Sequence, residues 1–187
     1  MLRTPILAAF AAATLASSSV FAQATSEKKG VSDALFAATA ADGGMTEVLV
    51  SQMAVTKSTD PDLKKWSEQM VEEHTKVNNQ LKELAAKKGV ALPTTITPGH
   101  QFCAQSLMGL SGEEFDTAYA LAQLVLHMST IAVFEAEAER GQDPDMKAFA
   151  AKTLPHIKGH TKQLKPIAMR FEKMKMEKEE KMEKSAH

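Results

Sequence analysis

The sequence has a single cysteine, a single tryptophan and a single tyrosine among its 187 residues. A lone cysteine, Cys103, excludes an intramolecular disulfide and leaves a free thiol, a small buried residue or an intermolecular link. Charge of one sign is not in excess either, with 22 basic and 23 acidic residues. No basic stripe is interleaved with aromatic residues, which argues against nucleic acid as a partner. Glycine-rich phosphate loops and nucleophile–base motifs are also missing.

Long apolar runs are absent except at the N-terminus. Arg3 precedes an alanine-rich apolar stretch from Ile6 to Leu15, and Val20-Phe21-Ala22 fits a small-residue cleavage site. We therefore expect residues 1–22 to be a signal peptide and the mature protein to be periplasmic or secreted, with association with the envelope as a further option. No later stretch approaches the apolar length of a membrane span, so no transmembrane segment is expected in the mature chain.

What the chain does have is helical periodicity. Apolar side chains recur at three- and four-residue steps, which is the spacing of a buried helical face. The segments with this pattern are 32–57, 61–88, 113–140 and 144–171. Ser32 suits the N-cap of the first, and Asp-Pro pairs suit the starts of the second and fourth. Ser111 and Glu114 form a capping-box pattern before the third.

The links between these segments predict how the helices are connected. Short links at 58–60 and 141–143 favour two antiparallel hairpins. The segment from 90 to 112 holds several prolines and glycines and is too long for a tight turn, so we expect a crossover with a short helix near 100–108. The sequence thus predicts one all-α, four-helix bundle over residues 32–170. A flexible segment, 23–31, precedes it, and a charged tail, 171–187, follows it as a helical or frayed end.

Four polar residues stand at apolar-face positions near the middle of the four helices. They are Glu47, His74, His127 and His160. At about 1.5 Å of rise per residue, all four fall within one or two turns of the bundle midplane, whichever way each helix runs. Buried polar groups cost free energy unless they are paired, and histidine is the commonest metal ligand. The pattern therefore predicts a transition metal, Zn, Cu, Fe or Mn, bound by these four residues.

The same pattern allows other interpretations. A metal-free polar layer would only specify the register of a structural or envelope-associated bundle. A metal-dependent redox enzyme would need an open coordination position, which four filled protein ligands deny. His156 lies one turn before His160 but directly follows Pro155, so we interpret it as a rim residue that supports the ligands. Met174 and Met176 offer soft thioether ligands in the tail, suited to Cu(I).

Several stretches resemble a known family. They are KSTDPDLKKWSEQMVEEHTKVNNQL, FDTAY with the following His127, and LPHIKGH. They are similar to an exported bacterial family of uncharacterised ferritin-like domains, whose members are often labelled as predicted outer-membrane proteins or domains of unknown function. The resemblance spans roughly residues 33–168. It implies a ferritin-like four-helix bundle with Glu47, His74, His127 and His160 at polar core positions, and it implies no established reaction.

The resemblance to ferritins and di-iron enzymes is weaker. Those proteins use a Glu-x-x-His pair on each of two helices. The residues three positions before His74, His127 and His160 are Val71, Leu124 and Ile157. None of them is a glutamate, so the pair is missing at all three. A mononuclear site therefore fits this sequence better than a carboxylate-bridged di-iron centre.

Overall fold

The computed structural model describes residues 30–185, which form five α-helices and no strand. The helices are α1 (Asp33–Lys57), α2 (Pro61–Lys88), α3 (Pro98–Met108), α4 (Gly112–Arg140) and α5 (Pro144–Ser185). The prediction of an all-helical fold is confirmed. The signal peptide expected at 1–22 lies outside the described residues, as does nearly all of the segment 23–31.

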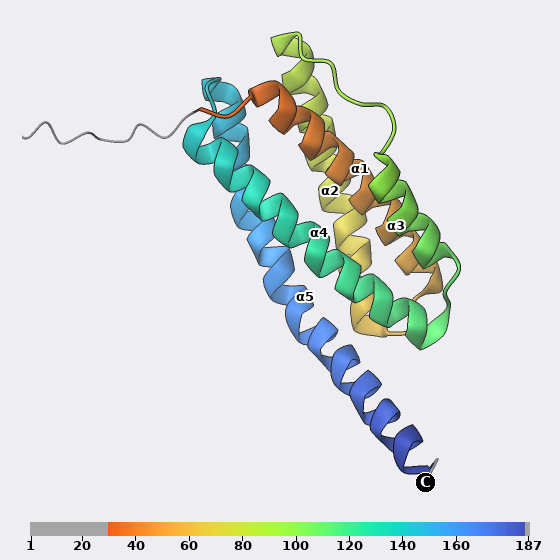
Figure 1. Ribbon diagram of the computed structural model, residues 1–187. Coiled ribbons are helices and arrows are strands. Elements are labelled where there is room, and N and C mark those ends of the chain that lie inside the picture. Colours follow the sequence, from red (N-terminus) through yellow and green to blue (C-terminus); the bar gives the residue numbers. More distant parts are fainter. Residues whose placement is uncertain (1–29, 186–187) are drawn as a thin grey trace, which may run out of the picture.

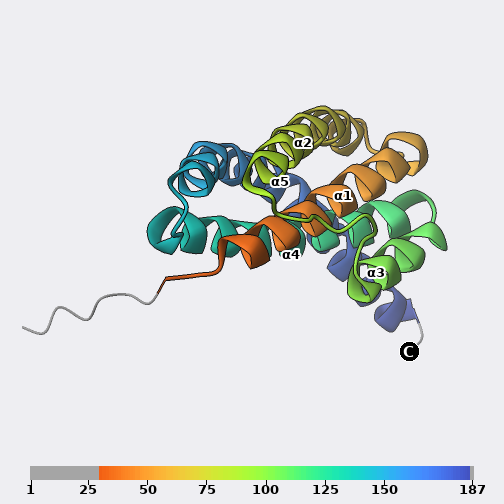
Figure 2. The ribbon, with the colours of Figure 1, turned by 90° about the horizontal axis from the view of Figure 1, so that it is seen from above.

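The long helices form a four-helix bundle (Figure 1). Helix α1 packs on α2, α4 packs on α5, and the two hairpins meet through α1 with α4 and α2 with α5. The crossover from α2 returns the chain along the bundle, so α2 and α4 run in the same direction (Figure 1). Helix α3 is the short crossover helix and lies outside the bundle against α1 and α4 (Figure 2). This is the ferritin-like arrangement with a long crossover that the sequence predicts.

Three helix starts follow the predicted capping chemistry. The Ser32 hydroxyl accepts a hydrogen bond from the Leu35 N–H at 3.3 Å, and the Asp60 carboxylate accepts one from the Leu63 N–H at 2.9 Å. Asp143 begins α5 in the same way. The fourth prediction is wrong in detail. Helix α4 follows Ser111, but the Ser111 side chain makes no capping hydrogen bond.

Helix α5 is longer than the periodicity indicates. It continues as one helix to Ser185, whereas the sequence placed the end of the bundle helix near 171. Phe171 is its last buried residue, and every described residue beyond it is exposed. Lys178 on this extension pairs with Glu113 at the start of α4. The charged tail is therefore a solvated helical projection beyond the bundle (Figure 1).

The core consists of two apolar clusters with a polar layer between them. One cluster gathers around Leu63, Trp66 and Phe115, and the other gathers around Phe36 and Phe134. Glu47, His74, His127 and His160 belong to neither cluster, yet each is at most 7% exposed. The bundle is thus stabilised by burial of apolar surface at both ends, which leaves its middle for polar side chains.

Helix α4 is more apolar than the sequence pattern indicated. An 18-residue window within it has a mean hydropathy of 1.4, so its length and composition meet the requirement for crossing a membrane. This departs from the expectation that no segment after the N-terminus approaches such a span. Core helices of bundles meet the same criterion, and α4 buries four polar side chains inside this one. They are Asp116, Gln123, His127 and Glu137.

Candidate metal centre

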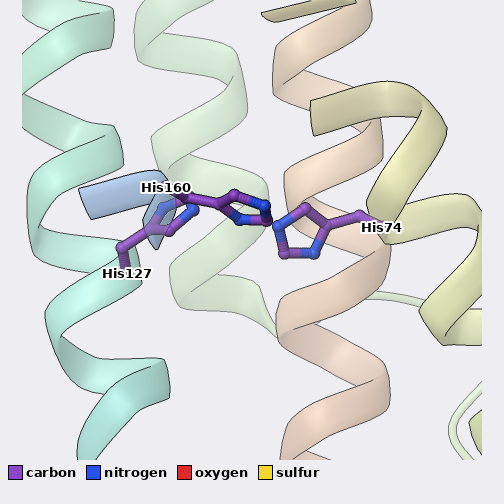
Figure 3. Close-up of side chains that lie close together, drawn as sticks. All are labelled: His74, His127 and His160. Atoms are coloured by element: carbon purple, nitrogen blue, oxygen red, sulfur yellow. The ribbon is translucent and has the colours of Figure 1, made fainter. Parts of the chain in front are cut away.

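Three histidines from three different helices converge in the polar layer (Figure 3). His74 comes from α2, His127 from α4 and His160 from α5. Each offers one ring nitrogen such that the three ligand atoms lie within 4.8 Å of one another. The ring centroids are 5.5–5.7 Å apart, and the residues are 7%, 1% and 4% exposed. Within residues 30–185 this is the one cluster of potential ligands with metal-binding geometry.

The proton positions on His127 are set by its neighbours. Its Nδ1 lies 3.0 Å from the main-chain carbonyl oxygen of Gln123, one turn earlier in α4. A carbonyl oxygen can only accept, so Nδ1 must carry the proton. In the neutral ring the lone pair is therefore on Nε2, which is buried and has no hydrogen-bond partner. His127 is thereby prepared as a metal ligand through Nε2.

In His160 the proton is held on the other ring nitrogen, Nε2. Its Nε2 lies 2.8 Å from a carboxylate oxygen of Glu73, and the other oxygen of Glu73 accepts a hydrogen bond from Gln69 at 2.8 Å. The carboxylate holds the proton on Nε2, which leaves the lone pair on Nδ1. That Nδ1 is buried and unpartnered. Carboxylates in this position orient metal-bound histidines and raise their basicity in many metal sites.

His74 completes the triangle from α2. Its Nε2 is also buried without a partner. Burial lowers the pKa of His74 to about 4, because the imidazolium form is desolvated and the other two imidazoles stand nearby. Burial likewise lowers the pKa of His160, although its bond to Glu73 works in the opposite direction. Both rings are therefore neutral near pH 7, which is the state that binds a metal.

Glu47 lies beside the histidine cluster. Its Oε1 is 3.3 Å from Nδ1 of His127, the nitrogen that already carries a proton. Both carboxylate oxygens are buried and without a hydrogen-bond partner. Burial alone would raise the pKa of Glu47, but the facing imidazoles of His127 and His74 outweigh it and lower the pKa. The arrangement puts a negative charge next to the histidine triangle, in the position where it supports His127.

The spacing of the three nitrogens suits a metal ion. Zinc and copper bind imidazole nitrogen at about 2.0–2.1 Å, which places two tetrahedral ligands roughly 3.4 Å apart. The observed limit of 4.8 Å is wider than this by little more than 1 Å. Small rotations of the imidazole rings would close that gap. Three buried ring nitrogens without hydrogen-bond partners thus face one another, and two of them carry a lone pair, which is a costly arrangement that a bound cation would relieve.

The triangle borders a cleft between the helices. The cleft has a volume of about 390 Å³ and is lined by Glu47, His74 and His160 together with residues of α1, α2, α4 and α5. A second cavity of about 50 Å³ lies on the α3 side and also reaches Glu47. His127 does not line the cleft. The cleft therefore meets the triangle on the side of His74 and His160.

The remaining residues singled out from the sequence lie outside the triangle. His156 is exposed and lines the cleft, a turn of α5 away from His160. Met174 and Met176 are both helical and exposed, and side chains two positions apart on a helix point to nearly opposite sides. The Met-x-Met pattern therefore does not form a chelating pair.

Two supporting residues were missed from the sequence. The charged residues next to Glu73 in the sequence predict a solvent-exposed helical face. In the structure, however, the Glu73 carboxylate is the hydrogen-bond partner of His160. Gln123 holds the His127 proton through its main-chain oxygen, and its side chain bonds to Ser51 and Tyr119. The only sequence signal for this role of Gln123 is its position, one helical turn before His127.

A buried aromatic side chain forms one wall of the triangle. Trp66 donates a hydrogen bond from Nε1 to the carbonyl oxygen of His160 at 3.3 Å. Its ring centroid is 5.5 Å from that of His127 and 6.4 Å from that of Tyr119. The single tryptophan of the chain thus packs against the ring of His127 and is anchored to the main chain of His160, which restricts the movement of both residues.

Comparison with solved structures supports the fold. A DUF305 fragment from Deinococcus radiodurans matches with a TM-score of 0.66 and 10% identity, over 76% of this chain and 99% of that one. The structure described as "CopM in the Cu(II)-bound form" matches with a TM-score of 0.65 and 16% identity, over 76% and 99%. A conserved hypothetical protein, rv2844, from Mycobacterium tuberculosis matches with a TM-score of 0.58 and 13% identity, over 73% and 89%.

Comparison at the level of sequence places the chain in a family. No curated protein matches it. One family profile matches residues 16–167, which is most of the chain and includes all three histidines. The family description assigns no activity, in agreement with what the resemblance implied. The chain belongs to the family described as Domain of unknown function (DUF4142).

Proposed function

We propose that this protein is an exported, periplasmic metal-binding bundle that holds one transition-metal ion with His74, His127 and His160. The observation that carries the proposal is the set of three buried imidazole nitrogens without partners, whose ligand atoms lie within 4.8 Å of one another. In two of the rings the neighbouring acceptors leave the lone pair on that buried nitrogen. Glu47 supports the site from beside His127.

Copper is the metal we favour. Three neutral imidazoles without a thiolate suit Cu(II) and Zn(II), and divalent copper binds such ligands most tightly in the first transition row. A structural neighbour of this chain carries the description "CopM in the Cu(II)-bound form". Its 16% identity supports a common fold, and its copper adds weight to this choice of metal.

The signal-peptide pattern at 1–22 supports export. We infer that the mature protein begins near Gln23 and meets its metal in the periplasm, as part of envelope or stress physiology. N-terminal sequencing of protein released by osmotic shock tests this part separately. An intact Met1 in the membrane fraction would contradict it.

Elemental analysis and thermal unfolding test the metal site. Metal-free protein should take up one equivalent of copper, and its melting temperature should rise because the ion binds only the folded bundle. His74→Leu should abolish both effects, while His156→Gln, on the exposed rim, should keep them. If the wild-type protein melts at the same temperature with a chelator and with each of Zn, Cu, Fe and Mn, the histidines form a metal-free polar layer instead.

A further inference from the structure

We propose that the metal keeps one coordination position open to the cleft, and that this position takes a small, neutral ligand with a proton to donate, such as water or hydrogen peroxide. This inference rests on the proposed metal site and concerns the chemistry of its fourth ligand. It differs from the sequence-based expectation, in which Glu47 filled the fourth position and closed the site.

The number of protein ligands leaves a position free. Three histidine nitrogens form the cluster, and Glu47 stands outside it with its Oε1 3.3 Å from the protonated Nδ1 of His127. Zinc and copper sites with three protein ligands bind water or substrate in the fourth position, whereas structural sites fill all four. The ligand set found here is that of an open site.

The cleft gives access to that position. Its volume of about 390 Å³ is far more than one metal ion needs, and it borders His74 and His160 but not His127. A water molecule takes about 30 Å³ in the liquid, so the space admits ligands of a few heavy atoms. The charged side chains that line the cleft around the site are balanced, since Glu72 and Glu73 stand against Lys76 and Lys152, so the rim itself does not select a charged ligand.

Glu47 supplies the selectivity. Its two carboxylate oxygens are buried and have no hydrogen-bond partner, and the residue lines the same cleft. A carboxylate accepts hydrogen bonds and repels anions. A ligand that coordinates the metal through a lone pair and donates a proton to Glu47 would satisfy both groups. An anion such as azide would bind at the same position more weakly, because the Glu47 carboxylate repels it.

Azide binding to the copper(II)-loaded protein tests the inference. Copper per chain is first measured in the same sample, because a protein that takes up no copper refutes the proposed metal site itself. With one copper bound, azide should produce a saturable charge-transfer band. Pulsed electron paramagnetic resonance in D₂O, without azide, should detect exchangeable deuterons on a bound water, and azide should displace them.

Two matched variants test the role of Glu47. Glu47→Gln keeps the size of the side chain and removes its charge, so azide should bind about tenfold more tightly than to wild type. Glu72→Gln makes the same charge change at an exposed position of the rim and should leave azide affinity within about twofold. Equal affinities in Glu47→Gln and wild type would overturn the selectivity assigned to Glu47.

A separate result would contradict the open coordination position. A protein with one copper per chain that shows neither an azide band nor strongly coupled deuterons has a closed coordination sphere. That outcome would overturn the inference and leave the proposed metal site standing. The two failures are therefore distinguished by the copper content measured at the start.

Discussion

Two buried glutamates in this bundle have opposite electrostatic surroundings. Glu47 lies in the polar layer at the middle and faces imidazoles, whereas Glu137 lies near the end of α4 and faces other carboxylates. Both are almost fully buried, and neither has a hydrogen-bond partner for its carboxylate oxygens. Yet the pKa of Glu47 is lowered, while burial, with Asp33 beside it, raises the pKa of Glu137 to about 7.

The difference shows that the neighbours of a buried carboxylate decide in which direction its pKa finally moves. Asp33 is held ionised by the main-chain N–H groups of Gln142 and Asp143, at 2.8 and 3.2 Å. Glu137 therefore meets a negative charge and tends to keep its proton. Glu47 meets imidazoles instead, and a bound cation would add to their effect. Of these two glutamates, only Glu47 in the middle of the bundle stays charged among imidazoles.

The largest expected effect comes from removing the imidazole that faces Glu47. In metal-free protein, His127→Leu should lower the free energy of unfolding at pH 7 by about 3 kcal/mol, because it removes the imidazole nearest to a buried carboxylate, at 3.3 Å. The double variant His127→Leu with Glu47→Gln should recover most of this loss. Urea unfolding of the four proteins in this cycle provides the measurement. Equal losses in the single and double variants would show that the two residues are not coupled.

The next effect concerns the pH dependence of metal-free protein. The pKa of His74 falls from 6.5 to about 4 on folding, so its contribution to stability is complete above pH 6.5 and is lost as pH falls toward 4. The loss amounts to about 3 kcal/mol at most. His74→Leu should therefore show a flatter decline than wild type between these pH values. His156→Gln, at the exposed rim, is the matched control and should follow the wild-type curve.

Glu137 should show the opposite pH dependence. Its pKa is raised on folding, so its contribution to stability is complete below about pH 4.5 and is lost as pH rises through 7. Glu137→Gln should therefore stabilise the protein by about 2 kcal/mol at pH 8 and change little at pH 5. Glu114→Gln, an exposed position on the same helix, should have no comparable effect. A Glu137→Gln curve parallel to that of wild type would refute the raised pKa.

The smallest effect is expected at the carboxylate that holds the His160 proton. Glu73→Gln should weaken copper binding by about tenfold, since removing a partner that orients a metal-bound histidine typically costs this much. Copper affinity is measured by competition with a chelator of known affinity. Glu72→Gln changes the adjacent residue in the same way and should leave the affinity unchanged. A full loss of binding in Glu73→Gln would mean that Glu73 is itself a ligand.

Much of this structure follows from local sequence patterns. Three- and four-residue spacing places His74 and His160 on buried helical faces, and the Asp-Pro pairs mark where α2 and α5 begin. A position at the middle of each helix predicts a shared level in the bundle. These features depend on one helix at a time, so a single sequence contains them.

Features that depend on two helices could not be predicted. The periodicity turns Glu47 toward the core, but the relative heights of α1 and α4 decide whether it joins the histidines or lies beside one. Glu73 became a partner of His160 only because α2 and α5 pack side by side. Glu137 stands in a charged segment of the sequence that looks solvated, yet it is fully buried. Each depends on helix packing, which a single periodic pattern does not encode.

The most direct test of the central claim is anomalous diffraction from crystals of the copper-loaded protein at the copper absorption edge. We predict one strong peak within about 2.1 Å of Nε2 of His74, Nε2 of His127 and Nδ1 of His160. Glu47 should lie beside that peak without coordinating it. A map without a peak in this triangle, or with its main peak at His156 or at the methionines of the α5 extension, would contradict the account.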